Sequence, residues 1–246
     1  ESNVSDIAAM GGFPKYALIS LTLPKNTDTK FIDKLYKGIN KKCKKYKINL
    51  IGGNLSNGKN TVISVVVIGL VEKKNLCLRS NAKINDLILV TGDLGSSRAG
   101  LQLLRNNKKG TSIKYYLNPN SRLNIGRLLS KHANAMEDVS DGLGSEILNI
   151  CSESKTGAVI YKEKIPLNKN TIKKTKKIKK DPYDYALYGG EDFELVFTIN
   201  KNKIKTLNKI KNKIKFTIVG KILPKKDGIF LLDKNRKTKL NQGYEH

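Results

Sequence analysis

The chain of 246 residues lacks several features that define whole classes of proteins. It has no tryptophan, only three cysteines and no C-x-x-C pair. Three scattered cysteines argue against a disulfide framework and a zinc site, and they suit a reducing compartment. No apolar run reaches the roughly 18 residues that span a bilayer, and the first residues include an acid but no basic signal-peptide segment. We therefore expect a cytoplasmic protein with no membrane partner.

Acidic side chains are also scarce, since 21 Asp and Glu residues stand against 47 Lys and Arg residues, a formal charge of +26. Such a charge attracts nucleic acids and other anions. Only six of the 47 are arginines, however, and the lysines stand among isoleucine and asparagine, as in TIKKTKKIKKD. These three residue types have AT-rich codons, so a biased base composition accounts for the excess. We expect no specific nucleic-acid partner, and a basic nucleic-acid-binding protein is the alternative from a different functional class.

Histidine occurs only at positions 132 and 246. Neither stands in a motif of a Ser-His-Asp triad, and His132 lies beside apolar positions of a helical pattern. We therefore assign no residue to nucleophilic catalysis.

What the chain does contain is an alternation of β-branched runs and amphipathic helical patterns, which predicts an α/β fold. Residues 13–23 alternate in polarity and predict a strand. Apolar residues recur at helical spacing over 29–46, with lysines on the outer face. The run INLIGGN and the long β-branched run 61–72 predict two further strands. These elements form the layer of a first domain.

Residues 73–82 lack such a pattern and mark a boundary, so we expect domains at 1–74 and 75–246. The second domain alternates strands and helices in the same way. Strands are predicted in DLILV, AMEDV, GAVIY, ELVFTI and FTIVGKIL, and helices in GSSRAGLQLL, SRLNIGRLLSKHA, GLGSEILNICSES and NKIKTLNKIKNKI. The basic segment 168–181 is expected to be a surface helix or a loop.

Because acids are few, the places where they cluster are informative. The segment NVSDIAAMGG puts Asp6 beside small residues and two glycines, which suits a capped helical turn or a metal ligand on a short helix. In EDVSDGLGSE, Asp138, Ser140 and Asp141 stand where a strand passes into a helix. Two carboxylates and a hydroxyl there suit Mg²⁺ bound together with phosphate, and capping of the helix by Asp141 is the structural alternative.

Two glycine turns add to this pattern. YGGEDFEL places Glu191, Asp192 and Glu194 within four residues, an arrangement that repels itself unless cations, amide donors or solvent offset the charge. VTGDLGSSRAG is neither a P-loop nor a dinucleotide-binding motif, so it is a structural turn or an anion site at a helix start. The clusters leave metal–phosphate chemistry and purely structural roles equally open.

The order of the motifs resembles that of a known family. NVSDIAAMGG, LIGGN, LRSNAKINDLILVTGDLGSSRAGL, NPNSRLNIGRLL, AMEDVSDGL, GGEDFELVFT and GYEH together resemble the thiamine-monophosphate kinases, within the superfamily of aminoimidazole ribonucleotide synthetase and selenophosphate synthetase. The resemblance runs from residue 3 to residue 246. It implies an α/β fold of two domains like that synthetase, with an N-terminal β-layer that forms a barrel in a homodimer and a C-terminal α/β sandwich.

The resemblance also implies a reaction and its residues. The family transfers the γ-phosphoryl group of ATP to thiamine monophosphate, with Mg²⁺ as cofactor and no covalent intermediate. By position it implies nucleotide contacts at Tyr36, Gly53, Asn54, Arg79 and Ser140, metal ligands at Asp6, Asp138 and Asp141, and substrate contacts at Glu191 and Tyr244.

Two departures from the family pattern keep other functions open. The family's N-terminal region, with paired aspartates and a substrate-binding histidine, has no counterpart in these residues, so the first domain is expected to be incomplete. The family has Asp after the paired glycines, where this chain has Asn54, which lacks the charge that Mg²⁺ prefers. Another ATP-using synthetase of the superfamily and a degenerate, non-catalytic homologue are therefore the alternatives.

Overall fold

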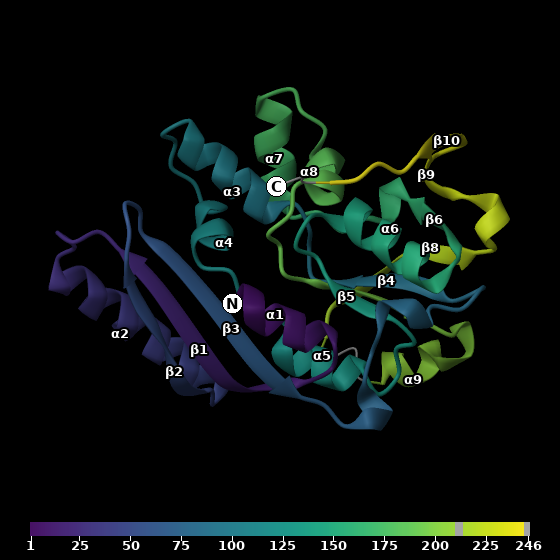
Figure 1. Cartoon of the computed structure of the whole chain (residues 1–246). Helices are drawn as coiled ribbons and strands as arrows, with labels where there is room; N and C mark the ends of the chain where they lie inside the picture. The colour runs from purple at the N-terminus through teal and green to yellow at the C-terminus, as the bar shows by residue number, and fades with distance from the viewer. Residues whose placement is uncertain (210–213, 244–246) are drawn as a thin grey trace.

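The computed structural model describes residues 1–209 and 214–243, which form two sheets of unequal size (Figure 1). The first is three-stranded with the order β2-β1-β3, and the second is seven-stranded with the order β10-β9-β6-β8-β4-β7-β5. Helices accompany both sheets, so the expected α/β architecture is confirmed. Among the described helices, none is both long enough and apolar enough to cross a membrane.

The first sheet is built by the N-terminal part of the chain. Its elements are α1 (Ser2–Ala9), β1 (Phe13–Leu23), α2 (Thr29–Tyr46), β2 (Asn49–Asn57) and β3 (Val62–Leu70). Strand β1 is central, parallel to β2 and antiparallel to β3. Because side chains alternate along a strand, Ile19, Leu21 and Leu23 all point to one face, where they are buried against α2.

The other face of this sheet is open. Val62, Val66 and Ile68 of β3 lie on it and are exposed, Val66 by 54% of its surface. All nine residues of the edge strand β2 are exposed as well. Exposed apolar surfaces of this kind are typical of faces that contact another protein.

The second sheet and its helices occupy the rest of the described chain. Its elements are η1 (Lys73–Asn75), η2 (Arg79–Asn81), β4 (Leu87–Thr91), α3 (Ser96–Arg105), α4 (Ile113–Leu117), α5 (Leu123–Leu129), β5 (Met136–Asp138), α6 (Leu143–Ser154), β6 (Gly157–Tyr161), η3 (Lys162–Lys164), α7 (Lys169–Lys177), α8 (Pro182–Tyr188), β7 (Leu195–Ile199), η4 (Lys201–Lys203), α9 (Ile204–Asn208), β8 (Phe216–Leu223), η5 (Lys225–Asp227), β9 (Ile229–Asp233) and β10 (Arg236–Lys239).

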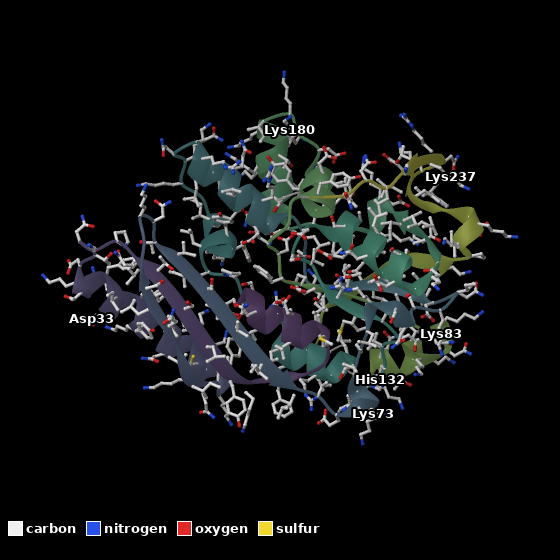
Figure 2. The ribbon with its side chains drawn as sticks, viewed as in Figure 1. Asp33, Lys73, Lys83, His132, Lys180 and Lys237 are labelled. Carbon is white, nitrogen blue, oxygen red and sulfur yellow. The ribbon has the colours of Figure 1, made fainter. Side chains whose placement is uncertain are left out.

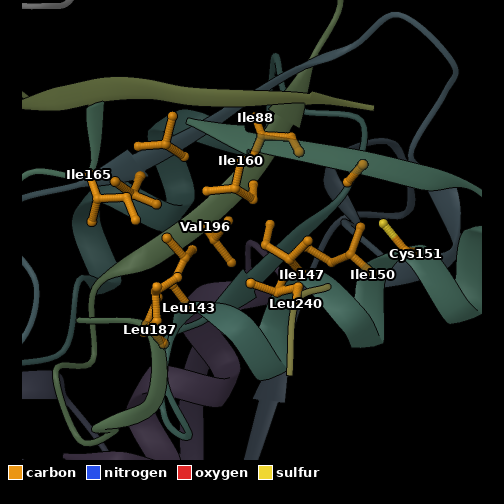
Figure 3. Close-up of a cluster of buried hydrophobic side chains, with 14 of the residues drawn as sticks. Ile88, Leu143, Ile147, Ile150, Cys151, Ile160, Ile165, Leu187, Val196 and Leu240 are labelled. Carbon is orange, nitrogen blue, oxygen red and sulfur yellow. The ribbon is translucent and has the colours of Figure 1, made fainter. Parts of the chain in front are cut away.

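Both faces of the larger sheet are buried, which explains its continuous apolar strands. On one face, Val196 and Ile88 pack against Leu143, Ile147 and the rest of the α6 side of the core (Figure 3). On the other face, the intervening side chains of the same strands form a second buried cluster with residues of α5 and α9. Strands buried on two sides have no polar alternation.

Several predicted elements are confirmed and others are corrected. The strand at 13–23, the helix at 29–46 and the strand FTIVGKIL have the predicted bounds. The basic segment 168–181 contains helix α7. The predicted helix NKIKTLNKIKNKI is confirmed over α9, whereas η4 replaces its first residues and Lys209 and Ile214 are not helical. Residues 210–213 of this prediction lie outside the described residues. The short elements α4, α8, β9 and β10 were not predicted.

Helix α1 lies between the two sheets, where it packs on α5 and β5 (Figure 1). Arg127 of α5 strengthens this junction by donating hydrogen bonds to Glu72 at 2.6 and 2.8 Å and to the Gly11 carbonyl at 2.8 Å. The predicted cap of α1 is wrong: Ser5 and Asp6 lie inside the helix, and its first turn has no side-chain cap. Asp6 is therefore available for another role.

Candidate active site

Asp138, at the end of β5, lies close to Asp6 of α1, and both are predicted metal ligands. Asp138 is only 5% exposed, and its Oδ2 atom has no hydrogen-bond partner among the described residues. Burial raises the pKa of Asp138 to about 7, and the negative charge of Asp6 raises it further. Ser5 lies beside this carboxylate and offsets part of the rise. The α1 side of the junction thus faces Asp138 with a second carboxylate.

Glu146 holds the same turn from the other side. Its Oε1 atom accepts hydrogen bonds from the backbone N–H groups of Asp141 at 2.9 Å and Ser140 at 3.2 Å, and from the Ser140 hydroxyl at 3.4 Å. Glu146 is buried in the first turn of α6. The carboxylate therefore fixes the backbone through which Ser140 and Asp141 are presented.

Arg79 brings a positive charge to this acidic cluster. Its guanidinium lies 3.1 Å from the Glu137 carboxylate, which is buried in the middle of β5. Burial raises the pKa of Glu137 and the neighbouring Glu146 charge adds to the rise, whereas Arg79 opposes it. Burial also raises the pKa of Asp6, and the charge of Arg79 lowers it. Arg79 is thus placed between two carboxylates, with half of its side chain exposed.

The GGEDFEL segment forms the neighbouring loop, and its three acids have three different environments. Glu194 is buried and forms an ion pair with Arg122, whose Nε atom donates to the Glu194 Oε2 atom at 2.8 Å. The same oxygen accepts a hydrogen bond from the Thr91 hydroxyl at 2.6 Å. Asp192 accepts backbone N–H groups. Glu191 is exposed, and its own N–H donates to the Ser140 carbonyl at 2.6 Å. A cation, amide donors and solvent therefore separate charges that would otherwise repel each other.

Asp192 also decides between the two interpretations of the VTGDLGSSRAG turn. Its oxygens accept hydrogen bonds from the N–H groups of Gly95 at 2.6 Å and Ser97 at 3.1 Å, at the start of α3. Burial raises the pKa of Asp192 to about 7, against the effect of these amides. The N–H groups at the start of α3 thus bind a carboxylate of the chain itself. This favours the interpretation of the segment as a structural turn over that of a binding site for a substrate anion.

The remaining predicted nucleotide contacts lie in a separate groove of the first domain. Tyr36 of α2 and the backbone of Gly53 and Asn54 line it, and its volume is about 480 Å³. Asn54 is exposed and pairs in register with Ser20, so its side chain lies on the open face of the sheet. The lining of this groove contains none of the carboxylates of the Asp138 turn.

The structure therefore gathers some of the predicted residues and not others. Those that it places around the Asp138 turn are Asp6, Arg79, Asp138, Ser140, Asp141 and the Glu191 loop. Tyr36, Gly53 and Asn54 lie in the other groove, and Tyr244 lies outside the described residues. Within residues 1–209 and 214–243, no three His, Cys, Asp or Glu side chains are close enough to hold a metal ion on their own.

Comparison with known proteins places this arrangement in a family. The model of the AIR synthase related protein N-terminal domain matches residues 1–71, and that of the C-terminal domain matches residues 83–233. A thiamine-monophosphate kinase of Buchnera aphidicola (subspecies Schizaphis graminum) is 42% identical, over 99% of this chain and 77% of the relative. The chain belongs to the thiamine-monophosphate kinase family. A thiamine-monophosphate kinase of Aquifex aeolicus is 38% identical, over 82% of this chain and 67% of the relative.

Solved structures agree with membership in the thiamine-monophosphate kinase family. A structure described as AaThiL complexed with AMPPCP and TMP superimposes with a TM-score of 0.89 at 34% identity, over all of this chain and 78% of that one. The hydrogenase maturation protein HypE in complex with ATP gives a TM-score of 0.82 at 13% identity, which shows the shared fold alone. The family that the motifs resemble is thereby confirmed.

Two side chains of this kinase-family site were not assigned from the sequence. Glu146 stands five residues after Asp141, and its position early in a helix is a signal that it can reach back to the preceding turn. Arg122 carries no such local signal, because its partner Glu194 is 72 residues away. Only the folded chain brings that pair together.

Proposed function

We propose that this chain transfers the γ-phosphoryl group of ATP to thiamine monophosphate, giving thiamine diphosphate and ADP. The observation that supports it most is the acidic turn at Asp138, with Asp6 and Arg79 beside it, in a chain of this family. Carboxylates that bind Mg²⁺ and an arginine that neutralises phosphate are the parts that direct phosphoryl transfer needs.

The donor groups at the turn fit a magnesium ion that arrives with its nucleotide. Asp138 has a buried oxygen that no other described residue hydrogen-bonds, and the charge of Asp6 acts on it as a second carboxylate. Mg²⁺ is commonly held by one or two carboxylates together with substrate phosphates and water, not by an all-protein cage. We infer that Asp6 and Asp138 hold this metal. We assign Asp141, on the same turn, to a further Mg²⁺, because no three such side chains of the described residues converge on one ion. Bound Mg²⁺ would neutralise charge on the transferring phosphoryl group.

The protein's own side chains would position the two substrates. Arg79 is exposed enough to pair with a nucleotide phosphate while Glu137 holds its guanidinium. We assign nucleotide contacts to the groove of Tyr36, Gly53 and Asn54 and to Ser140, and acceptor contacts to Glu191 and Tyr244. No covalent intermediate is required, because positioning and charge neutralisation are enough.

A homodimer would join the two groups of nucleotide-binding residues. The open face of the first sheet carries exposed Val62, Val66 and Ile68, and a second copy covering it would complete a barrel-like layer. We infer that the Tyr36 groove of one subunit meets the Asp138 turn of the other. The cysteines at 43, 77 and 151 are all free thiols, which suits the cytoplasmic location that we infer.

The test is a coupled assay of ADP release with ATP, Mg²⁺ and a panel of phosphorylated acceptors. We expect turnover with thiamine monophosphate that disappears when EDTA removes the metal. Asp141→Asn should lower the activity while leaving the melting temperature close to that of the wild type. Asp33→Asn is the control, since Asp33 projects from α2 far from the turn (Figure 2).

Two outcomes would contradict the proposal. Turnover with only a non-thiamine acceptor would point to another synthetase of the superfamily, and no turnover with any acceptor would point to a non-catalytic homologue. Nucleic-acid binding is a weaker candidate, because Lys73, Lys83, Lys180 and Lys237 project from separate parts of the surface and not into one groove (Figure 2).

A further inference from the structure

The loop that carries Glu191 passes through backbone conformations that non-glycine residues rarely adopt. Gly190, Glu191 and Phe193 have φ values of 69°, 62° and 50°. A left-handed conformation brings the Cβ atom of a non-glycine residue too close to its own backbone and is therefore unfavourable. Contacts from outside the loop must therefore hold Glu191 and Phe193 in place.

Asp192 lies between these two residues and supplies such contacts. One oxygen accepts the Gly95 N–H at 2.6 Å and the other accepts the Ser97 N–H at 3.1 Å. Helix α3 begins after Gly95, which has no side chain to cap it. Asp192 thus caps the helix from a position 97 residues along the chain from Gly95, and the helix dipole favours its negative charge.

The opposite side of the loop is joined to the Asp138 turn. The Glu191 N–H donates to the Ser140 carbonyl at 2.6 Å, and the Phe193 N–H donates to the Val139 carbonyl at 3.0 Å. The Phe193 ring is buried, whereas the Glu191 side chain is exposed and lines a pocket with Asn118. The loop is therefore held between α3 and the turn of the predicted metal ligands.

We propose that Asp192 is a positioning residue that fixes the loop on α3 and so presents Glu191 to the phosphate acceptor. The inference rests on the proposed function, in which Glu191 contacts thiamine monophosphate. Without both hydrogen bonds, the left-handed residues can relax to ordinary conformations, and the Glu191 carboxylate leaves its place. The nucleotide side is less affected, because Glu146 holds Ser140 and Asp141 independently.

The experiment compares the wild type with Asp192→Asn, Asp192→Ala and the control Asn200→Ala. Asn keeps the volume of Asp but offers one acceptor oxygen where the carboxylate offers two. Asn200 caps η4 by accepting the Asn202 N–H at 2.9 Å, at the opposite end of β7 from the loop. The variant Asn200→Ala therefore reports the effect of removing a helix cap alone. Hydrogen exchange of the 188–194 segment and the KM for each substrate are the readouts.

We expect faster exchange in 188–194 for Asp192→Asn, with a KM for thiamine monophosphate raised on the order of tenfold and an unchanged KM for ATP. Asp192→Ala should show a larger effect of the same kind, and Asn200→Ala should match the wild type in both readouts. Unchanged loop exchange in the Asp192 variants, or equal changes for both substrates, would overturn the proposal. A wild type without thiamine monophosphate turnover would overturn the proposed function instead, and the exchange data would still decide whether Asp192 holds the loop.

Discussion

The buried carboxylate of Asp138 lowers the stability of the fold. Asp138 is buried with an oxygen that lacks a hydrogen-bond partner in the described part of the chain, and the negative charge of Asp6 acts on it. A buried unsatisfied polar atom typically costs about 1–3 kcal/mol. A group kept under such conditions is better explained by a ligand than by packing.

We predict that Asp138→Asn leaves the chain at least as stable as the wild type, with a gain on the order of 1 kcal/mol, because it removes a buried charge. The same change should weaken Mg²⁺-dependent ATP binding by at least about tenfold. Thermal unfolding without ligand and calorimetric titration with ATP, each with and without Mg²⁺, measure the two effects. A clear loss of stability with unchanged nucleotide binding would show that Asp138 is structural.

A second prediction concerns Glu1, whose buried carboxylate bonds to Lys42, Tyr46 and the Ser121 N–H and so joins α2 to the segment before α5. Burial alone would raise its pKa, but these hydrogen bonds lower the pKa from 4.5 to about 2. The stabilisation is therefore complete above pH 4.5 and is lost as the pH falls toward 2. Glu1→Gln should cost about 1–2 kcal/mol at pH 7 and less at pH 3.

Urea unfolding of the wild type and Glu1→Gln at both pH values measures this difference. If the difference in free energy of unfolding between the two proteins is as large at pH 3 as at pH 7, the Glu1 carboxylate does not stabilise the fold in this way.

At the scale of elements, two glycines of the first domain have opposite roles. Gly38 lies within α2, and a Cβ atom added there meets no atom of the described residues within 4 Å. Gly53 of β2 lies so close to β1 that an added Cβ would stand 1.7 Å from the Ile19 carbonyl oxygen. The parallel pairing of β1 with β2 therefore requires glycine at 53 but not at 38.

We predict that Gly38→Ala raises the free energy of unfolding by roughly 0.5–1 kcal/mol, because alanine restricts the unfolded chain and favours the helix. Gly53→Ala should lower it by several times that amount, because β2 must separate from β1. Thermal unfolding followed by circular dichroism compares the two variants. Equal stability for both would mean that β2 can shift at little cost.

At the scale of the whole molecule, the open apolar face of the first sheet is the feature that a single chain leaves uncovered. We predict that Val66→Asp, on this face, lowers the molar mass of the assembly in solution to that of one subunit and abolishes ATP binding. The Val66 side chain is 54% exposed, so the subunit itself should keep its fold. Ile172→Asp is the control, since Ile172 is exposed on α7 of the other domain.

Light scattering and far-ultraviolet circular dichroism provide the two measurements. A wild type that is already a monomer, or a Val66→Asp dimer, would rule out this face as the subunit interface.

The sequence by itself determined the local elements and the family. Periodicities of two and of about 3.6 residues depend only on which face is buried, so they predicted the strand at 13–23 and the helix at 29–46. The motifs around Asp138 and Glu191 are contiguous, so their resemblance to the thiamine-monophosphate kinases was visible without a structure. The strands β9 and β10 were not predicted, because the apolar run IFLLD passes directly into the charged run KNRKTK, which shows no alternation of apolar and polar residues.

Only the tertiary structure decided which charges meet. Asp192 caps a helix that begins 97 residues before it, and Arg122 neutralises Glu194 across 72 residues. No local pattern encodes these pairs, because their distance in space depends on how β4, β7 and α5 pack together. The cap that local rules assigned to Asp6 was wrong for the same reason: the α1 junction places Asp6 near Asp138 and Arg79. Long-range packing thus brings Asp6 and Asp138, which are far apart in the sequence, to one place in the fold.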